Sequence, residues 1–167
     1  MDFKHNYEQK LKIIERAEEL AKDENTNRSF RELQVLHKLW KEELGPVGKE
    51  HREQIWERFS KSTKTIHDKR QAYYADMDKA HEKNLERKEE IIAQINAVNE
   101  DATNTHSAWQ KKIKTIEKLR QDFFNAGKVP LKVNEATWAK FKDAVRTFNR
   151  GKNHFYKDLK KDQYENL

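Results

Sequence analysis

The sequence "LWKEELGPVGKEHREQIWERF", residues 39–59, is the most informative segment for the fold because it places a sharp break between two helical patterns. Gly45 and Pro46 stand in the middle of the stretch, and Trp40 and Trp56 lie on either side of them. Glycine can adopt the positive φ that ends a helix, and proline prevents a helix from continuing. We therefore expect a turn that reverses one helix onto the next and brings the two tryptophans into one core.

The same pattern occurs a second time. Aligning Trp56 with Trp138 gives an offset of 82 residues, and upstream of the glycine the offset becomes 83. The first copy therefore has one extra residue in its turn. The predicted turn and core positions of the two copies are Trp40, Gly45, Pro46, Trp56 and Phe59 in the first, and Phe123, Gly127, Pro130, Trp138 and Phe141 in the second.

The boundary between the copies is also visible. "NYEQKLKII" (residues 6–14) parallels "NLERKEEII" (residues 84–92), and the chain ends on "ENL" (residues 165–167), which would begin the phrase again. We place repeat unit 1 at residues 6–83 and repeat unit 2 at residues 84–167. The final phrase predicts that the chain is part of a longer tandem array, although a coincidence of three residues would look the same.

Each unit is expected to form three helices, because apolar residues recur at steps of three and four. The expected helices of unit 1 span roughly residues 7–22, roughly residues 28–43, and residue 49 onward. The second carries the stripe Phe30, Leu33, Leu36 and Trp40, and the third the seam Trp56, Phe59, Thr63, Ile66, Arg70, Tyr73 and Met77. In unit 2, the second helix is expected around residues 107–125, and the third from about Asn134, a candidate N-cap.

No helix breaker separates the two units. Between His51 and Val98 there is no glycine and no proline, so we predict one continuous helix over about residues 50–98 that both units share. The expected fold is all-α: two tandem three-helix units joined by this long helix, with a coiled-coil-like seam. The arrangement would be elongated and spectrin-like, with each small unit stabilised by its neighbour.

Composition narrows the class of protein. Charged residues make up 38% of the chain and the mean hydropathy is -1.22, values that alone would indicate disorder. However, 35 basic residues nearly balance 29 acidic ones, and 10% of residues are aromatic, which favours charged faces of packed helices. The chain has no cysteine, no stretch resembling an export signal and no apolar run of about 18 residues. We expect a soluble cytoplasmic protein that does not bind membranes.

The repeated motif resembles a known family. A tryptophan, a G-P-V-P-like turn, a W-x-x-F helix and the phrase N-L-x-x-K are similar to the bacterial tandem repeats catalogued as domain of unknown function 349. Unit 1 departs from the pattern at Gly48, and unit 2 departs at Phe123 and Lys128. The phrase itself begins at Asn84 and ends at Lys88. The resemblance implies an all-helical bacterial cytoplasmic protein and brings no catalytic residues with it.

The usual signatures of catalysis are missing. No H-x-x-x-H pair, P-loop, G-x-G-x-x-G or G-x-S-x-G motif occurs, and the chain has only 4 glycines for phosphate-binding loops. Carboxylate pairs such as Glu89 and Glu90 fall in charge-rich helix faces, where no enclosed site separates their pKa values. We therefore predict a protein that is not an enzyme and has no catalytic residue, metal site, cofactor or small-molecule substrate.

Two basic residues occupy matching seam positions. Arg70 lies between Ile66 and Tyr73, and Lys152 lies between Phe148 and Phe155. Such a side chain can lay its stem on the aromatic rings and extend its charge into solvent. Alternatively, the cation grips a phosphate or a partner's carboxylate. Both readings remain open on sequence grounds.

Positive charge gathers in the second unit. Residues 111–161 contain 15 basic and 5 acidic residues, which is the pattern expected of a face that binds RNA or another polyanion. A solvated face without a ligand would have the same composition. The candidate polyanion-binding residues are Lys111, Lys112, Lys114, Lys118, Lys140, Arg146, Arg150 and Lys157.

These observations favour a non-enzymatic helical scaffold or protein-interaction module whose protein partners the sequence does not name. The alternative is an RNA-binding or ribosome-associated module that uses the basic face of unit 2. The two differ in one measurable property, because phosphate binding must weaken steeply as salt concentration rises.

Overall fold

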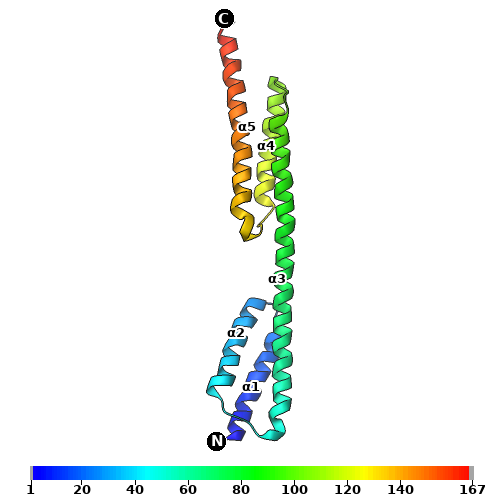
Figure 1. Ribbon diagram of the computed structural model, residues 1–167, viewed down its shortest axis with the longest axis vertical. Coiled ribbons are helices and arrows are strands. Elements are labelled where there is room, and N and C mark those ends of the chain that lie inside the picture. The colour runs from blue at the N-terminus through cyan, green and yellow to red at the C-terminus, as the bar shows by residue number, and fades with distance from the viewer. Residues whose placement is uncertain (1, 166–167) are drawn as a thin grey trace. The chain divides into compact units, whose positions relative to one another are not determined.

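The computed structural model describes residues 2–165, with their side chains through residue 163 (Figure 1). Its elements are α1 (Phe3–Ala21), α2 (Thr26–Lys38), a π-helical turn η1 (Leu39–Glu43), α3 (Lys49–Glu100), α4 (His106–Asn125) and α5 (Leu131–Glu165). No strand occurs in that range, and the all-α prediction is confirmed. The third occurrence of the repeat phrase lies almost entirely outside the described residues.

The helices begin where local capping signals stand. Asn25 caps α2 by accepting a hydrogen bond from the backbone N–H of Arg28 at 3.1 Å, and Thr105 caps α4 in the same way through Ala108 N–H at 3.1 Å. The expected start of the last helix at Asn134 is wrong. α5 begins at Leu131 because Pro130 ends the turn, and the first turn already forms with the Val133 N–H donating to Pro130 O at 3.1 Å.

The extra residue of the first turn is absorbed inside a helix. α2 continues into η1, whose five residues have π-helical hydrogen bonding, whereas α4 is α-helical through Asn125. A π turn holds one more residue than an α turn. The insertion that the repeat alignment places between Trp40 and Gly45 therefore lies within η1 rather than in the open turn.

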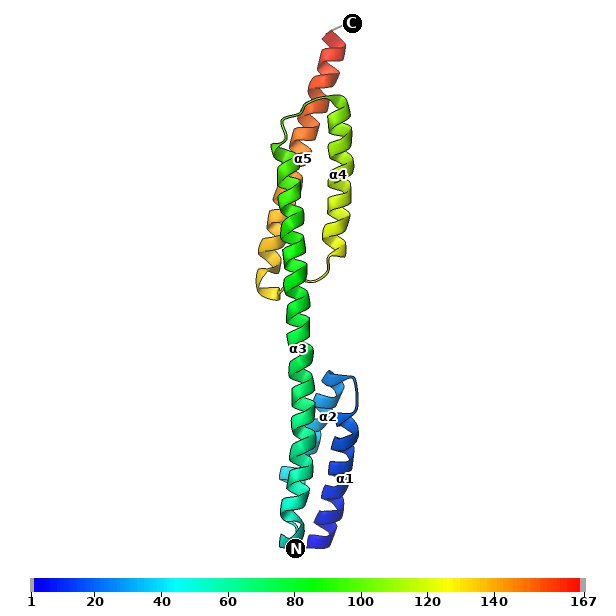
Figure 2. The same cartoon turned by 90° about the vertical axis from the view of Figure 1, so that its right-hand side faces the viewer.

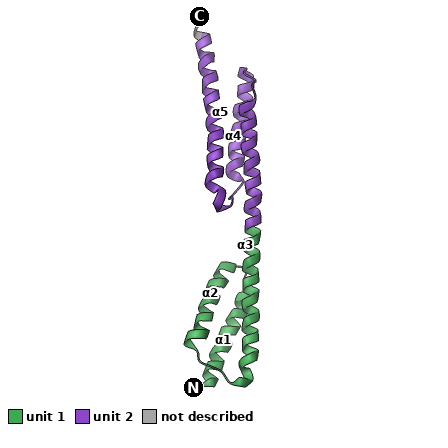
Figure 3. Cartoon of the chain, viewed as in Figure 1, with its two compact units in different colours: residues 1–77 green, residues 78–167 purple. Residues whose placement is uncertain are grey.

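The chain divides into two compact units, residues 1–77 and residues 78–167 (Figure 3). In unit 1, α1 and α2 lie beside the first part of α3 in both views (Figures 1 and 2). Its core contains Ile14, Leu20, Leu33, Phe59 and Ile66, all nearly inaccessible to solvent. Each of the three helices contributes residues to this core, which is what an amphipathic stripe on each helix requires.

The second unit has a core of its own. The second part of α3 supplies Ile91 and Ile95, α4 supplies Ile116 and Phe123, and α5 supplies Phe141, with other residues around them. The rings of Phe123 and Phe141 are stacked, with centroids 3.8 Å apart and planes 6° apart. This stacked pair connects the end of α4 to α5.

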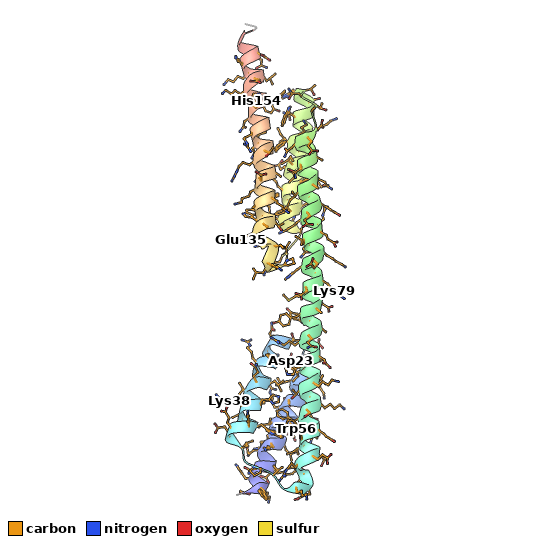
Figure 4. The ribbon with its side chains drawn as sticks, viewed as in Figure 1. Asp23, Lys38, Trp56, Lys79, Glu135 and His154 are labelled. Carbon is orange, nitrogen blue, oxygen red and sulfur yellow. The ribbon has the colours of Figure 1, made fainter. Side chains whose placement is uncertain are left out.

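The buried stripe of the third helix agrees with the predicted seam at Phe59 and Ile66 but has Ile55 and Ser62 where the seam had Trp56 and Thr63. The buried residues are Ile55, Phe59, Ser62 and Ile66 in the unit 1 part of α3, and Thr137, Phe141, Ala144 and Phe148 in α5. Trp56 stays 56% exposed on α3 (Figure 4), so the expectation that it packs with Trp40 in one core is wrong. The polar Ser62 and Thr137 hide this stripe in the sequence, whereas the larger neighbouring tryptophans attract attention.

The long helix is confirmed. α3 runs for 52 residues from Lys49 to Glu100, and the division between the compact units falls inside it, between Met77 and Asp78. The repeat boundary between Lys83 and Asn84 remains a prediction from sequence periodicity. Charged residues occupy most of the exposed positions of α3, although Tyr73 and Tyr74 are exposed near its middle.

Candidate functional site

An asparagine holds each of the two turns. Asn6 donates from Nδ2 to the backbone carbonyl of Pro46 at 2.9 Å, and Asn84 donates from Nδ2 to that of Lys128 at 2.7 Å. Both asparagines open the repeat phrase, and both carbonyls follow the turn glycine. We call this contact the turn clamp. It joins the first helix of each unit to the turn between the other two.

The two turn glycines both lie against the clamp, but only one of them has a positive φ. A Cβ added to Gly45 would lie 2.9 Å from Asn6 Nδ2, and one added to Gly127 would lie 2.8 Å from Asn84 Nδ2. Gly127 also has a φ of 97°, whereas Gly45 is not in the positive-φ region. The expected positive φ is therefore correct for Gly127 and wrong for Gly45, where the close approach of the clamp explains the glycine.

A lysine four residues after each clamp asparagine packs on the aromatic residue of the second helix. Lys10 Nζ lies 4.7 Å from the Trp40 ring centroid, and Lys88 Nζ lies 4.6 Å from that of Phe123. Burial lowers the pKa of both lysines, and for Lys10 the charge of Arg52 lowers it further. The asparagine and the lysine of the repeat phrase thus each make a contact that recurs in both units.

Lys112 has a structural role and does not belong to a polyanion-binding surface. Its side chain is only 7% exposed, and Nζ donates to the backbone carbonyls of Asp101 and Thr103 at 2.8 Å each. It also lies 4.5 Å from the Trp109 ring centroid. A cation that binds carbonyls just after the end of α3 stabilises that helix terminus, so we remove Lys112 from the candidate set.

The other predicted cations are exposed but do not form one face. Lys114 and Lys118 line a hollow with Arg87 and Asp122 where α4 faces α3, whereas Lys111 lines another near the α3–α4 loop. Arg146 lines a groove between α4 and α5. The remaining three, Lys140, Arg150 and Lys157, are exposed on α5 without lining any of these hollows.

The groove between α4 and α5 combines cations with exposed rings. Its volume is about 290 Å³, close to the lower end of the range for small-molecule binding sites. We call it the basic aromatic groove, and it is lined by Arg120, Phe124, Trp138, Phe141, Lys142, Val145, Arg146 and Asn149. Sequence analysis identified Trp138, Phe141 and Arg146 but missed Arg120, Phe124 and Lys142, because the groove is assembled from two helices.

Phe124 and Trp138 form the aromatic part of this groove. Their ring centroids lie 5.8 Å apart, and both rings pack on Phe141. Phe124 nevertheless stays 58% exposed and Trp138 stays 40% exposed. Both also line a second hollow with Lys88, near the start of α5 where Glu135 lies (Figure 4). The pair therefore separates two hollows and presents rings to solvent beside positive charge.

The cations of the groove have no carboxylate partners within the described part of the chain. Ion pairs hold Arg16 and Arg58 in unit 1 and Arg87 in unit 2, but none involves Arg120, Lys142 or Arg146. Lys142 Nζ instead lies 5.7 Å from the Trp138 ring centroid. The positive charge of the groove is thus available to an anionic ligand.

Of the two roles considered for Arg70, the structure supports packing on aromatic rings. Its guanidinium carbon lies 4.0 Å from the Phe30 ring centroid and 5.0 Å from that of Tyr74. Its Nε is buried without a hydrogen-bond partner. The guanidinium therefore stacks between rings of its own unit, and the side chain extends the core of unit 1 by packing.

Histidines in the described residues do not gather into a metal centre. No group of three or more histidine, cysteine, aspartate or glutamate residues there could hold a metal ion. His37 instead stacks on Phe59, with ring centroids 4.6 Å apart, and shares a 3.1 Å hydrogen bond between its Nε2 and Thr63 Oγ1. Within residues 2–165, none of the helices is long and apolar enough to cross a membrane.

Comparison with known proteins identifies a family and nothing more specific. The family model described as Domain of Unknown Function (DUF349) matches residues 1–50 and residues 54–132. No curated protein and no solved structure matches the chain. Each matched segment contains one complete turn clamp, Asn6 with Pro46 in the first and Asn84 with Lys128 in the second.

Proposed function

The chain belongs to the family described as Domain of Unknown Function (DUF349), and we propose that it serves as a non-enzymatic helical scaffold or protein-interaction module. Its two tandem units would each be a three-helix repeat that shares α3. The observation that carries this proposal is the recurrence of the turn clamp in both units. Contacts repeated at matching positions support a role in building a repeated shape rather than in one reaction.

The nature of the hollows agrees with a binding role. Three of those described above are open and are lined mainly by lysine, arginine and apolar side chains, with one carboxylate each in two of these three, Glu135 and Asp122. General acid–base catalysis needs titratable groups held at a defined distance in a site that separates their pKa values. The side chains around these hollows offer surface for a partner instead.

The scaffold proposal is tested by affinity capture with the full chain from its native cell, with and without nuclease. We expect the same proteins to be captured in both samples and to be lost from an Asn6→Ala, Asn84→Ala double variant whose turns are loosened. Lys157→Gln, at an exposed position of α5, is the control that should retain them. Proteins that disappear when nuclease is added would overturn the proposal.

An elongated, spectrin-like array is part of this proposal, supported by the unbroken helix α3. Small-angle X-ray scattering of the full chain in solution measures the pair-distance distribution directly. A compact protein of this length would have a radius of gyration of about 15 Å. We expect the measured radius of gyration to be far larger. A compact scattering profile would contradict the array.

A second candidate function is an RNA-binding or ribosome-associated module on unit 2. The specific observation in its favour is the basic aromatic groove, whose three cations form no ion pair with any of the described side chains. Counterion release makes such binding fall steeply between about 50 and 200 mM salt. A filter-binding titration over that range tests it, and no retention of RNA by the full chain at low salt would reject it.

A further inference from the structure

We propose that the basic aromatic groove binds a single-stranded segment of nucleic acid whose bases stack on Phe124 and Trp138. Arg120, Lys142 and Arg146 would contact the phosphates of the same segment. This inference rests on the second candidate function above and names the form of its ligand. It concerns only the groove between α4 and α5 and needs no contribution from unit 1.

The fold does not require an aromatic ring at position 124. Phe123 fills the core, being 2% exposed, whereas its neighbour Phe124 is 58% exposed. The repeat alignment places Lys41 at the corresponding position of unit 1, so this site of the repeat accepts a charged residue. An exposed phenylalanine that packing does not demand is a candidate contact for a ligand.

Among the described residues, two exposed rings and three cations come together at this place of the repeat in unit 2 but not in unit 1. Arg120, Lys142 and Arg146 align with His37, Ser60 and Lys64 of unit 1. Trp56, which aligns with Trp138, is exposed as well, but it has no second ring at position 41. The combination of two rings and three cations thus exists in one of two otherwise similar units, which argues against a purely structural origin.

Exposed aromatic rings favour single-stranded over double-stranded nucleic acid. In a duplex the faces of the bases are covered by their stacked neighbours, so exposed rings could contact base edges and the backbone but could not stack on the bases. A single strand can turn its bases toward aromatic side chains while its phosphates follow a row of cations. Phe124 and Trp138, with centroids 5.8 Å apart, lie beside three such cations. This arrangement favours single strands over duplexes.

The test is fluorescence polarisation with the full chain at low salt and labelled oligonucleotides of about 12 nucleotides, a length within the range that one small domain covers. The probes are oligouridine, oligodeoxyuridine and a duplex of equal length, with inorganic polyphosphate and poly-glutamate as competitors. We expect both single strands to bind more tightly than the duplex, and the RNA and DNA arms show which sugar is preferred. Neither competitor should match an unlabelled single strand.

Substitutions separate stacking from charge. Phe124→Leu keeps an apolar side chain but removes the ring, and should weaken single-strand binding about tenfold, whereas Phe124→Tyr should retain it. Arg146→Gln should reduce the slope of log affinity against log salt by about 0.7. The matched controls Trp56→Leu and Lys64→Gln in unit 1 should change neither quantity. Circular dichroism melting curves confirm that each variant is folded.

The two levels of the proposal fail in different ways. Equal affinity for single strands and duplex, with Phe124→Leu unchanged and Arg146→Gln weakened, would overturn the stacking inference and leave nucleic-acid binding intact. No binding of any oligonucleotide at low salt would overturn both. Displacement by poly-glutamate as effective as by a single strand would assign the groove to an acidic protein segment and would also overturn the inference.

Discussion

At Asn84, one side-chain amide holds the turn after α4 by donating to Lys128 O at 2.7 Å, and Asn6 holds the turn after η1 in the same way. The clamp lies close to the turn glycine in both units, because a Cβ at Gly45 or Gly127 would approach the amide nitrogen within 3 Å. The asparagine and the glycine therefore depend on each other. This dependence is a residue-scale property that can be measured.

Double-mutant cycles should separate the two glycines. Gly45→Ala should lower the free energy of unfolding in the wild-type background but cost little more once Asn6→Ala has removed the amide. Gly127→Ala should cost about 1–2 kcal/mol even in the Asn84→Ala background, because its positive φ of 97° remains strained. Urea denaturation measures the wild type, the four single variants and the two double variants. Equal costs of Gly45→Ala in both backgrounds would show that the clamp is not the reason for this glycine.

His37 should make unit 1 sensitive to pH. Burial lowers its pKa from the ordinary 6.5, and the charge of His67 lowers it further. Since the folded-state pKa lies below the unfolded value, the unfolded chain binds more protons in the window between them. Stability contributed by neutral His37 is therefore complete above pH 6.5 and is lost as pH falls through the folded pKa.

Denaturation of the wild type and of His37→Gln between pH 7.5 and pH 5 tests this expectation. The amide of glutamine can still bond Thr63 but does not titrate in this range, so the variant should lose less stability than the wild type as pH falls. His106→Gln is the control, because His106 is exposed on unit 2. Parallel losses in all three proteins would mean that His37 does not control the pH response.

At the scale of the element, η1 shows how a helix absorbs an inserted residue. α2 and η1 together bring Trp40 to within 4.6 Å of the Phe59 ring, although the turn of unit 1 is one residue longer than that of unit 2. A π turn takes up the extra residue near the helix end, where few contacts follow it. The core of unit 1 thus keeps its register.

Deleting Glu42 should therefore be tolerated. The deletion would give unit 1 the turn length of unit 2 and convert η1 into ordinary α-helix, and Glu42 is exposed. We expect a change in unfolding free energy of about 1 kcal/mol or less, the usual range for exposed positions. Deleting Arg31, also exposed but in the middle of α2, should be far more damaging because it rotates Leu33 out of the core. Equal losses for both deletions, measured by chemical denaturation, would contradict this reading of η1.

For the whole molecule, the two cores share a helix but no core residue. Phe59 is buried in the core of unit 1 and Phe141 in that of unit 2, and each occupies the same position of the repeat. Local stability can therefore differ between the units even though α3 runs through both. How independently the two units unfold can be measured in the intact chain.

Hydrogen exchange followed by mass spectrometry should show whether the two units unfold independently. Phe59→Ala leaves a large cavity, which typically costs about 3–5 kcal/mol, and should remove protection from α1, α2 and the first part of α3 while α4 and α5 remain protected. Phe141→Ala should give the reverse pattern. Loss of protection across all helices in either variant would instead indicate one cooperative unit.

The helices, the two turns, the repeat and the continuity of α3 can be predicted from the amino-acid sequence, because these features depend on neighbours three or four residues apart and on glycine and proline. The contacts that form across the chain depend on how the helices pack. Packing buried Ile55 in place of Trp56, turned Lys112 toward carbonyls near α3, and set Asn84 on the turn at Lys128.

The basic aromatic groove is one of the features that depend on how the helices pack. The sequence contained its charge, and the excess of lysine and arginine in unit 2 was visible from composition. What it could not supply was the pairing of Phe124 on α4 with Trp138 on α5, since the rotation of two helices about their axes depends on how their cores pack. Periodicity therefore predicted the helices, and only packing brought exposed rings and unpaired cations into one place.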